Sequence, residues 1–181
     1  MRIIAGSLGG RTFEAPAGPQ THPMGDKIRG ALFNALGDIQ GLSILDAYSG
    51  SGAISLEAIS RGAKMSVAIE NDKDAQVVIK KNIIALGLSA AIELAHTGVK
   101  SWSSRHAGTK FDVVICDPPY DDIRRDQLRT LASHLKPNGV VVFSLPPEVN
   151  VGLDDVEFQL LSSKAYGDAS LHFYRRNAGF V

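Results

Sequence analysis

The segment Cys116-Asp117-Pro118-Pro119-Tyr120 places a carboxylate, two prolines and an aromatic ring directly after the apolar run Val113–Ile115. Because proline fixes φ and has no N–H to donate, the proline pair ends the strand that this run predicts. Asp117 and the Pro118 carbonyl could each accept an N–H, while Tyr120 could stack on a ring. These groups suit recognition of a planar exocyclic amine at the carboxyl end of a strand, where open α/β sheets bind their ligands. An ordinary Asp-Pro turn is the alternative, and the aromatic residue after Pro-Pro favours function.

A second candidate site follows the apolar stretch at residues 42–45, where Asp46 precedes the glycine turn Ser49-Gly50-Ser51-Gly52. Glycines without a Cβ let the backbone approach a ligand closely, and the N–H groups at the start of the next helix can face that ligand. Glu70 ends the following predicted strand, a position suited to accepting both hydroxyls of a ribose. A glycine turn of this kind is shared by NAD-binding proteins and methyltransferases, so it does not distinguish them.

Hydrophobic periodicity predicts the elements that carry these groups. Strands are expected at 42–46, 65–69, 91–95, 111–116 and 140–144, and helices at 24–36, 54–61, 73–86, 100–104 and 123–135. Lys136-Pro-Asn-Gly139 is typical of a turn. Two later strands, 156–161 and 169–175, are expected to form an antiparallel hairpin with one buried and one solvent-facing side. The alternation predicts an α/β fold, a Rossmann-like doubly wound and mostly parallel seven-stranded sheet with this hairpin at its edge.

Residues 1–23 are rich in Gly and Pro and predict a small N-terminal β-hairpin, in which 1–5 and 11–15 flank Gly6–Gly10. We therefore divide the chain into an N-terminal hairpin arm (1–23) and a catalytic domain (24–181). The arm and the next helix contribute Arg2, Arg11, Lys27 and Arg29. They could form a solvated surface or a grip on a phosphate backbone, where charge sets affinity without reading sequence.

Composition narrows the functional classes. The 181 residues are 44% hydrophobic, enough for one substantial core, and 19 basic residues balance 19 acidic ones, so no global positive field indicates nucleic acid. The single cysteine, Cys116, excludes an internal disulfide and is expected in the core. The absence of a signal segment or of an apolar run near the roughly 20 residues of a membrane span predicts a cytoplasmic protein. The scattered histidines predict no metal site.

Asp117-Pro-Pro-Tyr120 resembles the (Asp/Asn)-Pro-Pro-(Tyr/Phe/Trp) motif of S-adenosylmethionine-dependent amino-methyltransferases. The whole chain resembles the RsmD-like family of bacterial ribosomal RNA guanine-N2 methyltransferases, which act on small-subunit 16S RNA. The segments specific to that family are Arg2-Ile-Ile-Ala-Gly6 at the start and Tyr166-Gly-Asp168 with Phe173-Tyr-Arg175 at the end. Further matches are Asp26–Asn34, Ser49–Ala53, Glu57–Gly62, Glu70 and Leu135–Gly139.

The resemblance implies S-adenosylmethionine as cofactor, S-adenosylhomocysteine as product and ribosomal RNA as partner, within a small subunit or an assembly intermediate. The implied cofactor-binding residues are Asp46, Tyr48, Ser49, Gly50, Ser51, Gly52, Glu70, Asn71, Thr97 and Gly98. The implied catalytic residues are Asp117, Pro118, Pro119 and Tyr120, and the implied RNA-binding residues are Arg2, Arg11, His22, Lys27 and Arg29. We expect a monomer that transfers methyl to guanine N2.

The chain departs from the family pattern at three places. His22-Pro23-Met24 replaces an Arg-Pro-Thr element, Thr97 replaces an Asp or Asn near the adenine, and Gly30 replaces an acid in the first helix. Three other functions remain open. A DNA adenine-N6 methyltransferase shares Asp-Pro-Pro-Tyr but would need a target-recognition domain that 181 residues do not hold. A non-catalytic RNA-binding or assembly factor fits the departures, and an NAD-dependent dehydrogenase fits only the glycine turn.

Overall fold

The computed structural model describes residues 1–16, 24–153 and 155–179 and contains one seven-stranded sheet in the order β3-β2-β1-β4-β5-β7-β6. The strands are β1 (Ser43–Ala47), β2 (Met65–Glu70), β3 (Ile92–His96), β4 (Phe111–Cys116), β5 (Leu135–Leu145), β6 (Phe158–Tyr166) and β7 (Ala169–Arg176). The helices are α1 (Asp26–Leu36), α2 (Ala53–Ser60), α3 (Lys73–Ala85), α4 (Val99–Arg105) and α5 (Arg125–Ala132). No helix within these described ranges is long and apolar enough to cross a membrane.

Strands β1 to β5 are parallel to one another, and β7 pairs antiparallel with both β5 and β6. The strand order reverses at β1, which pairs with β2 on one side and β4 on the other. The predicted Rossmann-like, doubly wound and mostly parallel sheet with an antiparallel C-terminal hairpin is therefore confirmed. Parallel strands joined by helices need both faces of the sheet covered, which explains their continuous runs of apolar residues.

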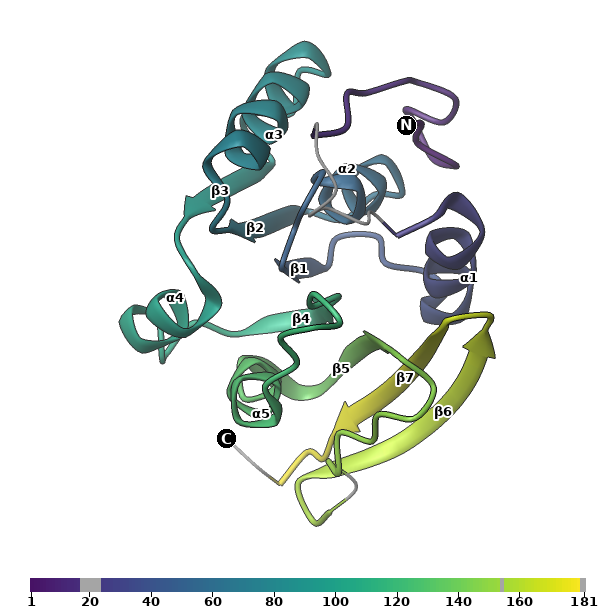
Figure 1. The fold of residues 1–181 in the computed structure, drawn as a ribbon, viewed down its shortest axis with the longest axis vertical. Coiled ribbons are helices and arrows are strands. Elements are labelled where there is room, and N and C mark those ends of the chain that lie inside the picture. The colour runs from purple at the N-terminus through teal and green to yellow at the C-terminus, as the bar shows by residue number, and fades with distance from the viewer. Residues whose placement is uncertain (17–23, 154, 180–181) are drawn as a thin grey trace.

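Helices cover the two faces unequally (Figure 1). On one face α1, α2 and α3 pack through Leu32, Phe33, Ile54, Leu56 and Ile79. On the other face α4 and α5 pack through Val99, Trp102, Leu128 and Leu131. Each helix buries an apolar stripe against the strands, so the two layers together enclose the core.

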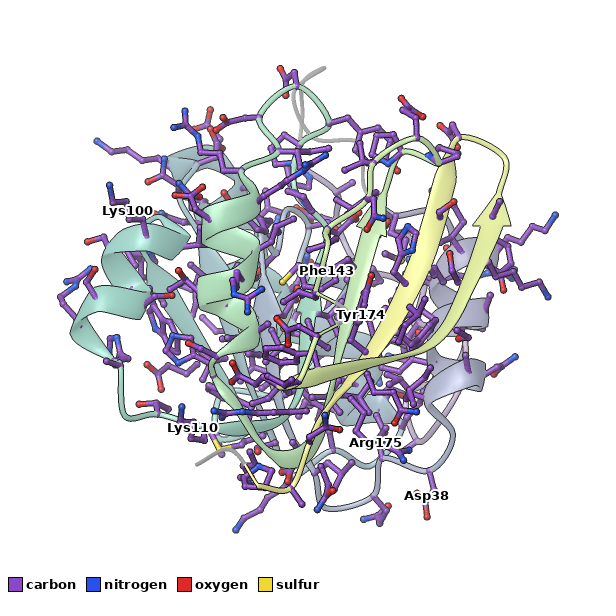
Figure 2. All side chains as sticks on the ribbon, turned by 90° about the horizontal axis from the view of Figure 1, so that it is seen from below. Asp38, Lys100, Lys110, Phe143, Tyr174 and Arg175 are labelled. Atoms are coloured by element: carbon purple, nitrogen blue, oxygen red, sulfur yellow. The ribbon has the colours of Figure 1, made fainter. Side chains whose placement is uncertain are left out.

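The C-terminal strand β7 is buried on both faces, contrary to the expected alternation of core and solvent. Tyr174 is 3% exposed and Leu171 is 1% exposed, although they point to opposite sides of the strand. Figure 2 shows Tyr174 beside Phe143 of β5, and the two rings meet edge to face with centroids 6.0 Å apart. The physical reason is position: β7 lies between β5 and β6, while β6 is the outer strand and exposes most of its side chains.

The segment Lys136–Gly139 was expected to be a turn, but it belongs to β5, which begins at Leu135. Phe111 pairs with Leu135, and the register then shifts before Val113 pairs with Val140, so the extra residues form a bulge inside the sheet. Asn138 has a φ of 65° there. Helix α5 is correspondingly shorter than the expected 123–135.

The N-terminal segment forms the expected hairpin only in part, with one isolated antiparallel bridge between Arg2 and Thr12. It packs on the body of the protein. Ile3 is fully buried among residues of α2 and α3, and the Ser7 N–H donates to the Ser60 carbonyl at 2.7 Å. A Cβ at Gly6 would lie 1.9 Å from that carbonyl oxygen, so this close approach requires glycine.

A buried carboxylate, Glu57 of α2, holds this segment in place. The N–H groups of Ile4 and Ala5 donate to Glu57 at 2.7 and 3.1 Å, and Arg61 Nε donates at 2.7 Å. Arg29 Nε lies 3.8 Å from the same carboxylate. Both Glu57 and Arg29 are 0% exposed. The buried charge is thus compensated by backbone donors and by two guanidinium groups.

Arg29 was expected to contact RNA, and the structure corrects this. Its guanidinium donates to the carbonyls of Met24 and Arg2 at 3.0 and 2.7 Å and to Asp26 at 2.9 Å. A fully buried arginine with these partners links α1 to the N-terminal segment and cannot reach a phosphate backbone. Periodicity could not reveal this, because a lone arginine on a helix usually faces solvent.

We predict that Glu57→Gln lowers the free energy of unfolding by about 3 kcal/mol or more, because it removes the buried anion between Arg29 and Arg61 and turns an amide N–H toward backbone donors. Urea unfolding of the purified variant measures this. Asp26→Asn removes an exposed partner of Arg29 and serves as the control, with an expected loss below about 1 kcal/mol. Equal losses in the two variants would contradict the assigned role of Glu57.

Candidate active site

The candidate site lies at the carboxyl edge of the parallel strands. Strands β1, β2, β3 and β4 end at Ala47, Glu70, His96 and Cys116. Because all four strands point the same way, the residues that follow each one meet at this edge, across the point where the strand order reverses. The structure thereby gathers the predicted segments 46–52, 70–71, 97–98 and 117–120 from four separate parts of the chain.

Asp46 is fully buried at the end of β1. Its Oδ2 accepts the Ser55 N–H at 3.1 Å and the Ser55 hydroxyl at 2.7 Å, whereas Oδ1 has no hydrogen-bond partner among the described residues. Burial raises the pKa of Asp46 to about 7, the Ser55 hydrogen bonds oppose this, and the charges of Asp117 and Glu70 raise it further. A buried oxygen left unpaired beside a ligand site is suited to a donor on that ligand.

The turn after β1 has an unusual backbone. Tyr48, Gly50 and Gly52 have φ values of 65°, 55° and 76°, and Tyr48 is one of only two non-glycine residues with positive φ in the described chain. A Cβ on Gly52 would lie 3.2 Å from Ile79, whereas a Cβ on Gly50 would have no atom of the described residues within 4 Å. Gly52 therefore serves packing against α3, and Gly50 leaves open space at the surface of the turn. Ser51 is buried next to it.

Glu70 binds the turn to the end of β2. Its Oε2 accepts the Gly50 N–H at 2.7 Å and its Oε1 accepts the Asp72 N–H at 2.7 Å. Ser49 completes the connection, because its N–H donates to the Ile69 carbonyl at 2.9 Å. Glu70 remains half-buried, so lone pairs of both oxygens stay available to hydroxyl donors such as those of a ribose.

The loop between β3 and α4 brings Thr97 and Gly98 to the same edge of the sheet. The Thr97 N–H donates to the Glu70 carbonyl at 3.0 Å, and a Cβ on Gly98 would lie 3.7 Å from the side chain of Asn71. Arg105 of α4 donates to the Thr97 hydroxyl oxygen at 2.9 Å. Since that oxygen already accepts a hydrogen bond, its own O–H is free to point elsewhere. Arg105 was not among the predicted residues, and a helical arginine carries no sequence signal for this contact.

The motif after β4 lies beside β5. Pairing of Cys116 with Phe143 places Asp117 next to Ser144, a buried serine of β5. Burial raises the pKa of Asp117 to about 6, and the nearby Ser144 hydroxyl acts in the opposite direction. Pro118 is buried, Pro119 is exposed, and Tyr120 is 44% exposed. Sequence reasoning missed Ser144, because only the strand register places it beside Asp117.

Cys116 is fully buried between these groups, and burial raises the pKa of its thiol well above the usual value, which agrees with the expected core role. The described residues contain no group of three His, Cys, Asp or Glu side chains arranged to hold a metal ion.

The residues expected to contact RNA differ from one another in their exposure to solvent. Arg2, Arg11 and Lys27 are exposed, and Arg2 Nε donates to Asp26 at 3.1 Å, next to Lys27. These three can meet an external partner, unlike the buried Arg29. His22 lies outside the described residues, as does Pro23.

We predict that Asp46→Asn becomes more stable than the parent protein as the pH rises from about 4 to about 7, with a difference in the free energy of unfolding that grows across this range. The folded-state pKa of Asp46 lies above its usual value, so the folded protein binds this proton more tightly than the unfolded chain and loses stability while the pH passes through that window. Asparagine cannot ionise and still accepts from Ser55. Urea unfolding at pH 4, 6 and 8 should therefore show a difference between variant and parent that grows with pH. A constant difference would contradict the buried, protonatable carboxyl.

Comparison with known proteins defines the family. The family described as "Conserved hypothetical protein 95" matches residues 1–175. Ribosomal RNA small subunit methyltransferase D of Escherichia coli (strain K12) is 32% identical over 185 residues, which cover 98% of this chain and 91% of that protein. A solved structure provisionally assigned as the methyltransferase yhhF of Escherichia coli has a TM-score of 0.87 and 27% identity, with 98% of each chain covered.

The structure of SMU.776, provisionally assigned as a methyltransferase and complexed with SAH, has a TM-score of 0.67. At 17% identity, with 82% of this chain and 48% of that chain covered, this likeness concerns the fold alone. The family resemblance inferred from sequence is confirmed: the chain belongs to the "Conserved hypothetical protein 95" family, together with the ribosomal RNA small subunit methyltransferase D proteins.

Proposed function

We propose that this protein transfers a methyl group from S-adenosylmethionine to the exocyclic N2 of a guanine in small-subunit ribosomal RNA. The observation that carries the proposal is the pairing, on one sheet edge, of the Asp117–Tyr120 motif with the turn held by Asp46 and Glu70. The ribosomal RNA substrate follows the printed name of the Escherichia coli relative. We expect the enzyme to act as a monomer on a small subunit or an assembly intermediate.

The residues at this edge fit the proposed cofactor. When bound, S-adenosylmethionine supplies an electrophilic sulfonium methyl group, so the protein's main task is orientation. The unpaired Asp46 Oδ1 and the open space at Gly50 suit the methionine end with its ammonium group. Glu70 suits the ribose hydroxyls, and Asn71, Thr97 and Gly98 lie where the adenine would follow. The remaining turn residues Tyr48, Ser49, Ser51 and Gly52 shape the backbone between them.

The residues after β4 suit the target base. Asp117 and the Pro118 carbonyl can each accept one N–H of the exocyclic amine, and Tyr120 can stack on the ring. Guanine N2 is a poor nucleophile because its lone pair is delocalised into the ring. Two acceptors aimed at its N–H groups favour a pyramidal nitrogen whose lone pair points away from them, toward the methyl donor. The proton released after transfer can pass to Asp117 or to water.

The target base must leave its stack to reach this site, at a cost of a few kcal/mol. Backbone contacts can offset that cost. Arg2, Arg11 and Lys27 are exposed cations on the N-terminal segment and the first turn of α1, where they suit phosphates flanking the target.

We predict that Asp117→Ala reduces turnover on the order of 100-fold to 1,000-fold, because a preorganised acceptor for the reacting amine is lost. The dissociation constant for the cofactor should change less than about threefold, which is below about 1 kcal/mol. Turnover at saturating cofactor should fall below about pH 6 in the parent protein, as Asp117 becomes protonated.

Calorimetric titration and steady-state kinetics measure the two quantities. Asp122→Ala, which removes an exposed carboxylate of the next loop, serves as the control with unchanged turnover. Full activity of Asp117→Ala would rule out the assigned role.

We further predict that Arg11→Ala weakens RNA binding uniformly across sequences and reduces the slope of log affinity against log salt by about 1, because one phosphate contact is removed. Filter binding of small-subunit RNA at several salt concentrations measures this. Lys110→Ala provides the control, because Lys110 directly precedes β4 and so lies at the end of that strand away from the candidate site. An unchanged slope for Arg11→Ala would exclude Arg11 from the RNA contact.

The decisive test of the proposed function uses labelled S-adenosylmethionine and small ribosomal subunits that lack the modification, with naked 16S RNA and adenine-rich DNA in parallel. Nucleoside analysis of the product should give N2-methylguanine in RNA. N6-methyladenine in DNA would replace the proposed substrate, and binding of RNA without binding of cofactor would indicate a non-catalytic factor.

A further inference from the structure

The turn between β6 and β7 lies at the same sheet edge as the Asp117 motif. Asp117 follows the Cys116–Phe143 pair, which places it beside Ser144, and Ser144 in turn pairs with Leu171 of β7. The pair Tyr166–Ala169 closes the hairpin, so Asp168 lies in the turn just three residues before Leu171. The strand register therefore brings Asp168 to the edge that carries Asp117 and Ser144, although Asp168 follows Asp117 by 51 residues in the sequence.

The Asp168 side chain is a carboxylate with no partner among the described residues. It is exposed, and no hydrogen bond or ion pair to it occurs in the part of the chain that the structure describes. Together with Glu148, it acts on the Tyr120 phenol: burial is the largest cause of the raised pKa of Tyr120, and the charges of Asp117, Asp168 and Glu148 add to it. The Tyr120 ring, which we expect to stack on the target base, therefore has the carboxylates of Asp168 and Glu148 near it, in addition to Asp117.

The chemistry of the nucleobases gives such a carboxylate a use. In adenine and cytosine, the ring nitrogen on the Watson–Crick edge beside the exocyclic amine is an unprotonated acceptor. In guanine the corresponding nitrogen, N1, carries a hydrogen. An acceptor placed beside Asp117 would therefore form a second hydrogen bond with guanine and would meet a lone pair in adenine or cytosine.

We propose that Asp168 determines base specificity by accepting the N1–H of the target guanine while Asp117 accepts an N–H of its N2 amine. The inference rests on the proposed function and deepens it. Asp168 suits this role better than Glu148 because the turn is anchored by ladder pairs on both strands and is joined through Ser144 to Asp117. Glu148 lies instead in the non-strand segment after β5.

The test compares guanine with 2-aminopurine at the target position. 2-Aminopurine keeps the amine at C2 but has an unprotonated N1 and lacks O6. Because the loss of O6 is common to parent and variants, a change in the ratio of the two rates between proteins reports the N1 contact. Small subunits are reconstituted from 16S RNA that carries either base at the nucleotide methylated by the parent enzyme. Asp168→Asn replaces the carboxylate with a neutral amide, which is a weaker acceptor for the guanine N1–H and offers an N–H donor to the unprotonated N1 of 2-aminopurine. It should lower the ratio of guanine to 2-aminopurine methylation by about tenfold to 100-fold, with slower transfer to guanine and faster transfer to 2-aminopurine.

Glu148→Gln is the matched control and should leave the ratio unchanged. Thermal unfolding and cofactor titration should give the same values for parent and both variants, because Asp168 is exposed and unpaired in the described structure. An unchanged ratio in Asp168→Asn, or a shift in Glu148→Gln alone, would overturn the inference while leaving the proposed function intact. Failure of the parent protein to methylate guanine N2 would remove both.

Discussion

The parallel pairing of β1 with both β2 and β4 is the constraint on which the candidate site depends. Parallel strands must be connected by crossovers, so each strand starts at one edge and ends at the other. Asp46, Glu70, Thr97 and Asp117 all follow or end such strands and consequently meet without any local contact in the sequence. The antiparallel strand β7 extends this edge, because its first residues, not its last, lie beside the end of β5.

The edge carries electrostatic costs that the rest of the fold offsets. Burial raises the pKa values of Asp46 and Asp117, so ionising either carboxyl in the folded protein costs free energy. Tyr48 adds an unfavourable backbone conformation in the turn. Glu57 shows the contrasting case, a buried carboxylate whose oxygens receive two backbone N–H groups and an arginine. Among the described residues, the two carboxyls whose pKa values are raised, Asp46 and Asp117, both lie at the proposed site, as expected where binding and not stability determines the residue.

Much of the fold and part of the site could be predicted from the sequence, and the failures have a common physical origin. Apolar runs ending in Asp46, Glu70 and Asp117 identify strand ends, because a buried strand and a polar terminus are both local features. Ser144 and Asp168 could not be found in this way, since the register that places them near Asp117 is a long-range property. Arg29 was predicted to face solvent because of its position on a helix. Only tertiary packing provides the carbonyls and carboxylates that surround it in the core. Lys136–Gly139 has turn composition, yet pairing with β4 absorbs it as a bulge.

The N-terminal segment is hydrogen-bonded to the helices that pack behind the candidate site. Its backbone N–H groups bind Glu57 of α2, while its Arg2 carbonyl accepts from Arg29 of α1. Helix α2 begins at Ala53, directly after Gly52, the last residue of the turn at the candidate cofactor site. Exposed Arg2 and Arg11 are therefore connected to that turn through one helix and one buried carboxylate rather than through a loose linker. An RNA backbone held by these cations would be positioned relative to Asp117 by the same packing that positions Asp46, because every element between them belongs to the core.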